Sequence, residues 1–149
     1  MMQSFLGSLN TRGYPDRHCL TDWNVVGNWD GNFRLQHAQS RKFLCFNRRA
    51  RVTLRLNGSD EKCIFIEEIQ ESGFSRIRSA WKSDLYLGFN GRGRFQNPLS
   101  YHLKPRCFDW IKLREKVLEL MRRQRAHEKA HAGAQLFPTN SMCRCLQNY

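Results

Sequence analysis

The sequence contains one motif that is typical of metal-dependent hydrolases. His127-Glu128-Lys129-Ala130-His131 matches the H-E-x-x-H pattern, in which two imidazoles on one helix face bind zinc and the glutamate is the general base. A catalytic zinc needs a third protein ligand, and no Asp, Glu or His follows His131. Only Cys143 and Cys145 follow it as ligand types. We therefore expect a surface helix with two solvated histidines, and a zinc hydrolase is a remote alternative.

No other set of catalytic residues is present in the sequence. There is no G-x-S-x-G motif, no glycine-rich phosphate loop after a strand, and no pair of acids in a framed cleft. The sequence therefore predicts that the protein is not an enzyme, with no catalytic residue, no metal and no cofactor.

Basic side chains supply the more abundant chemistry. The 149 residues include 25 Lys and Arg against 13 Asp and Glu, a formal net charge of +12. This charge indicates an anionic partner, which could be nucleic acid, a sulfated polysaccharide or an acidic membrane surface. Guanidinium groups bind sulfate and phosphate through two parallel hydrogen bonds. The basic residues form two clusters, Arg48, Arg49 and Arg51 in the first and Arg92, Arg94, His102, Lys104 and Arg106 in the second.

The aromatic residues help to choose among these partners. Binding of single-stranded nucleic acid normally requires exposed aromatic rings between the charges. Here the rings stand mostly at alternating strand positions that should point inward. Gly91-Arg92-Gly93-Arg94 resembles an RNA-binding element, but it occurs once and within a turn. The pattern therefore favours a polysaccharide over nucleic acid.

Six cysteines, at positions 19, 45, 63, 107, 143 and 145, bear on the compartment. None of the first four lies in a C-x-x-C pair, which argues against a zinc ribbon or a thioredoxin site. An even number at wide spacings suits an oxidising compartment, and buried free thiols of a cytosolic protein are the alternative. Asn57-Gly58-Ser59 is a glycosylation sequon in a turn, which also favours the secretory route.

The N-terminal segment shows no recognisable signal peptide. Residues 1–11 contain no continuous apolar stretch before Arg12, and no apolar run of the chain approaches the length of a membrane span. For a secreted protein, we expect either a leader that precedes this sequence or export by another route.

Residues 42–52 and 85–95 repeat nearly the same sequence at an offset of 43 positions. Leucine, phenylalanine, asparagine and the later arginine coincide, and aromatic residues coincide at Phe43 and Tyr86. Each copy predicts a hairpin whose turn opens with asparagine. One such unit cannot bury its own apolar face, so a period of about 40 residues indicates a repeat architecture.

Apolar and polar residues alternate elsewhere and predict further short strands over residues 20–26, 33–37, 52–56, 63–69, 74–78 and 107–111. This spacing indicates a barrel or sandwich, and the period favours a threefold barrel. From Lys112 the apolar residues adopt helical spacing among arginines, which predicts a basic helix ending near Gly133. We predict a flexible segment over 1–18, a β domain over 19–113, and a basic helix with a loose tail over 114–149.

Residues 33–113 resemble the fibroblast growth factor family. Ala50-Arg51-Val52, Cys63-Ile64-Phe65-Ile66-Glu67 and Phe74 stand where the family has a Gly-basic-apolar turn, Cys-x-Phe-x-Glu and Tyr. Leu44-Cys45-Phe46-Asn47 and residues 85–94 match two further family segments. The chain is most similar to the subfamily with a cysteine in both central strands. It departs from the family at Ala50, Lys62 and Phe74, and its N-terminal part is shortened.

The resemblance implies an all-β fold, a β-trefoil of three hairpin-pair repeats whose first repeat is short or incomplete, here followed by the C-terminal basic α-helix. It also implies a disulfide between Cys45 and Cys63, a loop worth roughly 3 kcal/mol by chain-entropy reasoning. Cys19 with Cys107 is a candidate second pair, although sequence alone cannot establish it. The receptor-facing positions implied are Glu67, Phe74, Ile69, Ser72 and Ile111, and the heparan-sulfate positions are Arg92, Arg94, Lys104 and Arg106.

The expected function is that of a secreted, extracellular glycoprotein growth factor. It would bind and activate a fibroblast growth factor receptor tyrosine kinase with heparan sulfate as co-receptor, as a monomer or a heparin-dependent dimer, without nucleic-acid binding or membrane insertion. The other interpretation of Phe74 and Ile111 is that they are core residues, and of the arginines that they form a solvated face. The main alternative function is an intracellular basic trefoil module that binds nucleic acid or an acidic protein.

Overall fold

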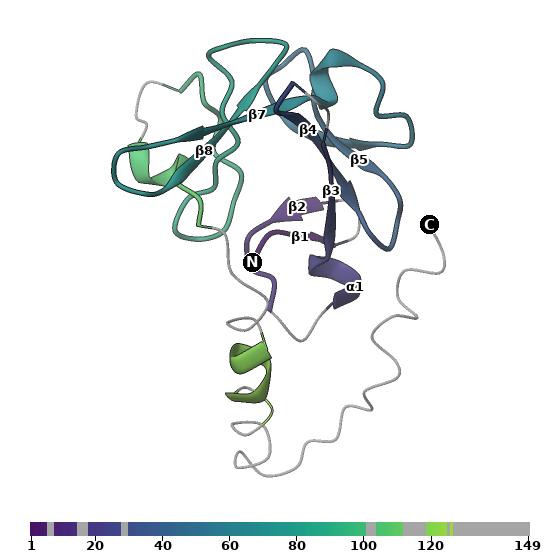
Figure 1. Ribbon diagram of the computed structural model, residues 1–149, viewed down its shortest axis with the longest axis vertical. Coiled ribbons are helices and arrows are strands. Elements are labelled where there is room, and N and C mark those ends of the chain that lie inside the picture. Colours follow the sequence, from purple (N-terminus) through teal and green to yellow (C-terminus); the bar gives the residue numbers. More distant parts are fainter. Residues whose placement is uncertain are drawn as a thin grey trace.

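A computed structural model of the protein describes residues 1–5, 8–14, 18–27, 30–100, 104–111, 119–124 and 126, with the backbone alone at 5, 18 and 19. The elements are short, and most are strands (Figure 1). In chain order they are β1 (Gln3–Phe5), β2 (Ser8–Asn10), α1 (His18–Thr21), β3 (Trp23–Gly27), β4 (Asn32–His37), β5 (Phe43–Phe46), β6 (Val52–Arg55), the 3₁₀ helix η1 (Glu61–Cys63), β7 (Phe65–Ile69), β8 (Ser75–Ser79) and the 3₁₀ helix η2 (Pro105–Phe108).

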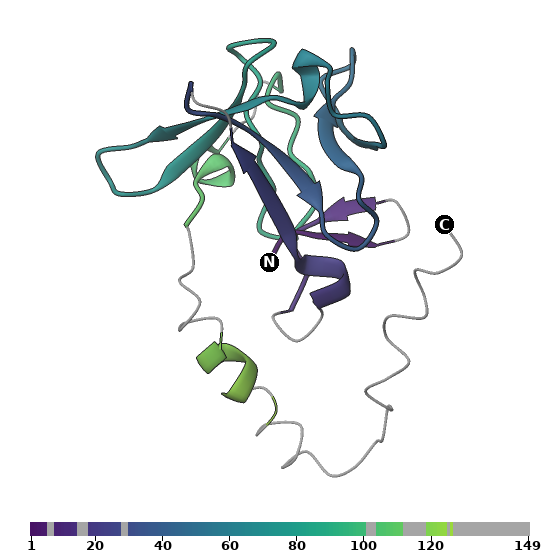
Figure 2. The same ribbon diagram turned by 45° about the vertical axis from the view of Figure 1, so that its right-hand side comes forward.

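The strands pair as successive antiparallel hairpins, β1 with β2, β3 with β4, β5 with β6, and β7 with β8. Strand β4 joins the hairpins, because it also pairs with β5 and β7. The last part of the chain closes the structure through single bridges, among them Arg78 with Tyr86, Phe89 with Phe95, and Ser75 with Trp110. This architecture is the predicted all-β trefoil. Figures 1 and 2 show the β7–β8 hairpin projecting from one side of the barrel and β5 on the other.

The core is built from the inward-facing residues of these hairpins. Its buried members are Leu35, Leu44, Phe46, Ala50, Phe65, Leu85, Leu87 and Phe89. The rings of Phe46 and Phe65 lie 6.0 Å apart between centroids, and those of Phe89 and Phe95 lie 6.1 Å apart in an edge-to-face arrangement. Such aromatic pairs stabilise a core beyond the area that they bury. The prediction that most strand aromatics point inward is therefore confirmed for these positions.

The two repeat copies adopt the same turn. Asn47 Oδ1 accepts hydrogen bonds from the backbone N–H groups of Arg49 and Arg51 at 2.9 and 3.1 Å. Asn90 Oδ1 accepts the corresponding bonds from Arg92 and Arg94 at 3.0 and 3.1 Å. An asparagine side chain that binds the backbone of its own turn favours that turn over other local structures. The sequence repeat is therefore a repeat of turn geometry.

Ala50 and Gly93 occupy the same position in the two turns, and both have positive φ angles, 56° and 74°. Glycine adopts this region freely, whereas for an alanine it costs about 1–2 kcal/mol. Ala50 is only 4% exposed and belongs to the core, so the burial of its methyl group offsets part of that cost. This contact explains how the chain tolerates alanine where the family has glycine.

A disulfide joins Cys45 of β5 to Cys63 of η1, as expected from the family resemblance. Both side chains are fully buried. The candidate pair of Cys19 with Cys107 does not form, because Cys107 is a free and half-buried thiol.

Two predicted strands are replaced by helical turns. The strand expected over 20–26 is split into α1 and β3, and the strand expected over 107–111 begins instead as η2. Pro105 stands at the first turn of η2, where its fixed φ favours a helical start. Only Trp110 of that segment makes a strand bridge.

Residues 119–124 are helical, in agreement with the predicted basic helix. The remainder of that helix, Cys143, Cys145 and the H-E-x-x-H motif at 127–131 lie outside the described residues. Among the residues that the structure describes, no helix is long and apolar enough to cross a membrane.

Candidate functional site

The β7–β8 hairpin positions most of the predicted receptor-facing residues. Its strands pair from Phe65 with Ser79 to Ile69 with Ser75. The turn is closed by backbone hydrogen bonds from Gln70 N–H to Phe74 O and from Gly73 N–H to Gln70 O, at 2.8 and 2.9 Å. Gly73 has a φ of 82°, so a residue without a Cβ suits this turn.

Three large apolar side chains are exposed around this hairpin. Ile69 is 78% exposed, Phe74 41% and Ile111 69%. Ser75 and Trp110 exchange both backbone hydrogen bonds, at 2.9 and 2.8 Å, so their neighbours Phe74 and Ile111 stand next to each other across this bridge. The interpretation of Phe74 and Ile111 as core residues is therefore wrong. Ile69 is the last residue of β7 and pairs with Ser75, the residue after Phe74. We use the name apolar patch for these three exposed residues, Ile69, Phe74 and Ile111.

Ser72 and Glu67 lie on the same hairpin as the patch. Ser72 is exposed in the turn. Glu67 is partly buried on β7, and Ser75 donates its hydroxyl proton to Glu67 Oε1 at 2.5 Å. A charge-assisted bond of this kind holds the carboxylate in one orientation beside the patch.

Ion pairs across the sheet hold the hairpin in place. Arg76 Nε donates to Asp109 Oδ1 at 3.0 Å, which ties β8 to the segment after η2. Glu68 accepts hydrogen bonds from the Arg78 guanidinium and, at 3.1 Å, from the Tyr86 hydroxyl. Burial raises the pKa of the Tyr86 phenol, and the hydrogen bond to Glu68 raises it further. These bonds hold the hairpin against the second repeat copy, which contains Tyr86, and against the segment after η2, which contains Asp109.

The predicted polysaccharide-binding residues do not all lie together. Arg92 and Lys104 line one cleft of about 350 Å³ with Asn90, Gly91, Gln96 and Cys107. Arg94 is exposed in the adjoining turn. Arg106 lines a different cavity, although Cys107 borders both. Arg92 and Lys104 therefore share one cleft, Arg94 is exposed two residues after Arg92, and Arg106 lines the neighbouring cavity.

Arg12 lies beside Arg92 and was not predicted. Its Nε donates to Arg92 O at 2.8 Å, and the N–H of the preceding Thr11 donates to Gly93 O at 3.0 Å. The N-terminal hairpin therefore places the exposed Arg12 side chain beside the turn of the second copy. We call Arg12, Arg92, Arg94 and Lys104 the basic surface.

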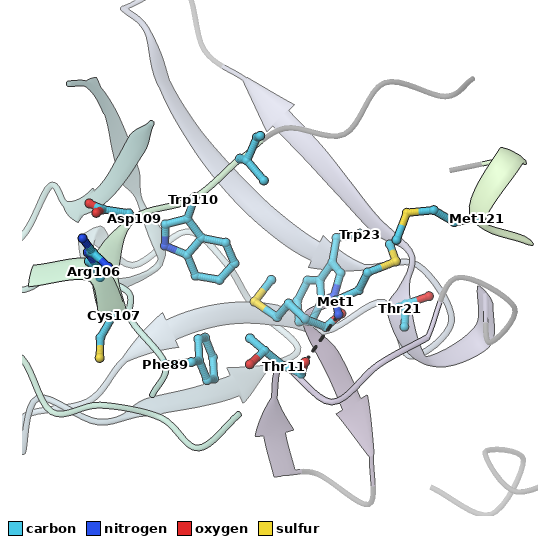
Figure 3. Close-up of a pocket in the computed structure, with 12 residues that line it drawn as sticks. Met1, Thr11, Thr21, Trp23, Phe89, Arg106, Cys107, Asp109, Trp110 and Met121 are labelled. Atoms are coloured by element: carbon cyan, nitrogen blue, oxygen red, sulfur yellow. Dashed lines mark hydrogen bonds between the residues drawn. The ribbon is translucent and has the colours of Figure 1, made fainter. Parts of the chain in front are cut away.

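The cavity that Arg106 lines measures about 570 Å³. Figure 3 shows Trp23, Phe89 and Trp110 around it, with Met1 between them. Both indole N–H groups donate to backbone carbonyls, Trp23 to Met2 at 3.3 Å and Trp110 to Leu87 at 2.8 Å, so their rings offer the cavity an apolar surface. Among the described residues that line it, the one carboxylate, Asp109, is paired with Arg76. The described part of this wall therefore offers no unpaired carboxylate that could act as a general base.

Within the described part of the chain, no group of three or more His, Cys, Asp or Glu side chains could hold a metal ion. The motif at 127–131 falls outside that part and remains a sequence pattern.

Comparison with known proteins identifies the family. A family model described as "Fibroblast growth factor" matches residues 17–106, more than half of the chain. The chain belongs to the fibroblast growth factor family. Fibroblast growth factor 18 of Homo sapiens is 31% identical over 61 residues, which cover 41% of this chain and 30% of the relative. Fibroblast growth factor 17 of Danio rerio is 31% identical over 61 residues, covering 41% of this chain and 28% of the relative.

The alignments with these two relatives span under a third of each relative's length. The family model covers more of this chain, and its match includes the β7–β8 hairpin, the disulfide and the whole second repeat copy. Ile111 and Arg12 lie outside it. The apolar patch and the basic surface are therefore each completed by one residue from beyond the matched segment.

Proposed function

We propose that the protein is a secreted growth-factor ligand that binds and activates a fibroblast growth factor receptor tyrosine kinase, with heparan sulfate as co-receptor. The observation that supports it most is the apolar patch of Ile69 and Phe74 on the β7–β8 hairpin and Ile111 on the neighbouring segment. Exposed apolar clusters rimmed by polar residues are typical of protein interaction sites. Glu67 and Ser72 supply that polar rim and complete the receptor-binding set.

The hydrophobic contribution of this patch is substantial. Burying a large aliphatic or aromatic side chain contributes about 1.5–3 kcal/mol, and central apolar anchors dominate interface energies. Ile111 is more exposed than Phe74 in the free protein, so it has more surface to bury against a receptor.

Heparan sulfate is the polyanion that the basic surface suits. Arg92 and Lys104 share one cleft, and Arg94 adjoins it. Guanidinium groups bind sulfate through paired hydrogen bonds. The rings of Phe46, Phe65 and Phe89 are buried and unavailable for stacking on bases, which supports a polysaccharide partner over nucleic acid. Arg106 belongs to the proposed set at its edge.

The disulfide supports an extracellular location, because such bonds persist in oxidising compartments. The ligand acts as a monomer or as a heparin-dependent dimer, performs no catalysis and uses no cofactor. Its growth-factor domain spans residues 19–113 and is followed by a basic helix and tail over 114–149. The segment over 1–18, predicted to be flexible, contains the β1–β2 hairpin and contacts the domain through Thr11 and Arg12.

Two measurements test the proposal on the purified full chain. Heparin-column elution should require moderate salt, and cells that express the receptor should show receptor phosphorylation. The variant R92A/R94A should elute at clearly lower salt than R49A/R51A, which makes the same charge change in the equivalent turn. Equal elution of the two variants would contradict the assignment of the basic surface.

The apolar patch is tested separately. I111S should reduce receptor phosphorylation by about tenfold or more, which corresponds to a loss of at least about 1.4 kcal/mol. L99S changes another exposed apolar residue, 53% exposed and outside the apolar patch, and should leave signalling unchanged. Equal signalling by wild type and I111S would remove the patch from the interface, and no phosphorylation by wild type would refute the function.

A further inference from the structure

A cleft lies between the loop after β6 and strands β3 to β5, and a glycosylation sequon forms part of its rim. Val26, Arg34, Phe43, Leu56, Asn57, Gly58 and Ser59 line this cleft of about 570 Å³, a size within the range of about 300–1,000 Å³ of pockets that hold small molecules. Asn57-Gly58-Ser59 is the one Asn-x-Ser/Thr triplet of the chain. The acceptor asparagine therefore stands inside the wall of the cleft.

The loop holds the acceptor in a defined position. Arg34 Nε donates to Gly58 O at 2.7 Å. Gly58 lies on the Phe43 ring so closely that a Cβ there would meet Phe43 Cγ at 2.5 Å. Only glycine fits between Asn57 and Ser59, and the contact fixes the backbone on both sides of it.

The Asn57 side chain is exposed and its nitrogen is available. Its Oδ1 accepts the Ser59 backbone N–H at 2.9 Å, which turns Nδ2 away from the loop. No described residue accepts a hydrogen bond from Nδ2. A glycan attached at this atom therefore meets solvent on one side and the cleft on the other.

The cleft presents both an apolar and a hydrogen-bonding surface, and these match the C–H face and the oxygen atoms of a sugar ring. Leu56 is 76% exposed and Val26 41%, and these apolar groups suit the C–H face of a sugar. Arg34 is the cross-strand partner of Val26, so its guanidinium stands beside the apolar wall and can donate to sugar oxygens.

We propose that Asn57 is N-glycosylated and that the first N-acetylglucosamine occupies this cleft, covering Leu56 and Val26. The inference rests on the secretion included in the proposed function. Asn57 Nδ2 attacks C1 of the reducing-end sugar of a lipid-pyrophosphate-linked oligosaccharide. The C1–N bond forms as the C1–O bond to pyrophosphate breaks, the lipid pyrophosphate leaves, and the amide proton passes to a base of the transferase.

The site lies away from the apolar patch. The sequon follows β6, which pairs with β5, whereas the patch surrounds the β7–β8 hairpin, and β5 and β8 occupy opposite sides of the barrel in Figures 1 and 2. A glycan at Asn57 therefore leaves the proposed receptor face open.

Secretion of the full chain from eukaryotic cells tests occupancy. Intact mass should show a glycan increment that is lost in N57Q and S59A and retained in S59T, which keeps the hydroxyl. A secreted wild-type chain without the increment overturns the proposal. Receptor phosphorylation is measured on the same sample, so signalling without a glycan overturns only this inference, and a glycan without signalling refutes only the proposed function.

Trimming the glycan tests whether the first sugar occupies the cleft. An endoglycosidase that leaves one N-acetylglucosamine should preserve slow amide exchange over residues 25–27 and 55–58. Removal of the whole glycan by an amidase should speed that exchange. The amidase converts Asn57 to aspartate, so the variant N57D is the control for this change. In L56S the glycan should remain while the one-sugar and no-sugar forms exchange equally. If the one-sugar and no-sugar forms of the wild type exchange equally, the first sugar does not occupy the cleft.

Discussion

Reduction of the Cys45–Cys63 disulfide should lower the free energy of unfolding by about 3 kcal/mol. The bond joins residues 18 positions apart. The loop-closure relation gives an entropy of about −11 cal/mol/K for a loop of that length, or about 3 kcal/mol at 25 °C. For a folded domain of about 100 residues, 1 kcal/mol shifts Tm by roughly 4–8 °C. The reduced protein should therefore melt about 12–24 °C below the oxidised form.

The measurement compares thermal unfolding of the oxidised protein with that of protein reduced in denaturant and refolded with reductant present. C45A/C63A provides a second route to the same state and should be at least as unstable, because both side chains are fully buried and truncation adds small cavities. A shift below about 2 °C would refute the entropic argument, since it would imply that the unfolded chain gains no freedom on reduction.

Burial of both sulfurs adds a kinetic test. A reductant can reach them only after β5 and η1 separate, so native-state reduction should be slow and should accelerate with denaturant. Cys107 supplies an internal reference, because it is a free and only half-buried thiol. Without any reductant, an alkylating reagent should label Cys107 and leave Cys45 unlabelled, and labelling of Cys45 under these conditions would contradict the buried bond.

Two further outcomes follow from the turns and the sheet. Gly93→Ala should lower the free energy of unfolding in urea by about 1–2 kcal/mol or more, because the φ is 74° and the new Cβ would meet Arg12 Cγ at 2.8 Å; no loss would contradict the turn geometry. The raised pKa of Tyr86 means that its contribution to stability is complete below the unfolded pKa of about 10 and is lost as pH rises through the folded pKa. Tyr86→Phe should therefore flatten the alkaline limb of stability against pH, and an unchanged limb would argue against the bond to Glu68.

Local chemistry explains which parts of the fold could be predicted from the sequence. The two turns at Asn47 and Asn90 are formed by bonds within five residues, so the repeated sequence already contained their geometry. The alternation of aromatic residues likewise predicted the core around Phe46 and Phe65. Strand spacing and the repeat period indicated an all-β threefold barrel, whereas the trefoil and the Cys45–Cys63 bond were implied by the family resemblance. Both the fold class and the bond are confirmed.

Contacts between distant segments explain the rest. Nothing near Arg12 in the sequence signals a partner 80 residues away. The exposure of Phe74 could not be decided, because alternation predicts the face of a strand and Phe74 ends a turn. Cys107 was placed in a strand because its neighbours are apolar, yet Pro105 starts a 3₁₀ turn there. The roles of the receptor-facing and basic residues stay predictions.

The contact of the N-terminal hairpin with residues 92–94 also sets the timing of folding. Thr11 and Arg12 bind Gly93 and Arg92 across about 80 residues, which at a synthesis rate of about 5–20 residues per second is a delay of roughly 4–16 s. Barrel closure must wait for that delay, since non-local pairing forms only after the chain between the partners exists. During this delay the backbone partners of Thr11 and Arg12 are missing, although α1 and Trp23 can already contact the first hairpin. Any fragment that ends before residue 92 therefore contains the whole first hairpin but lacks these two late contacts.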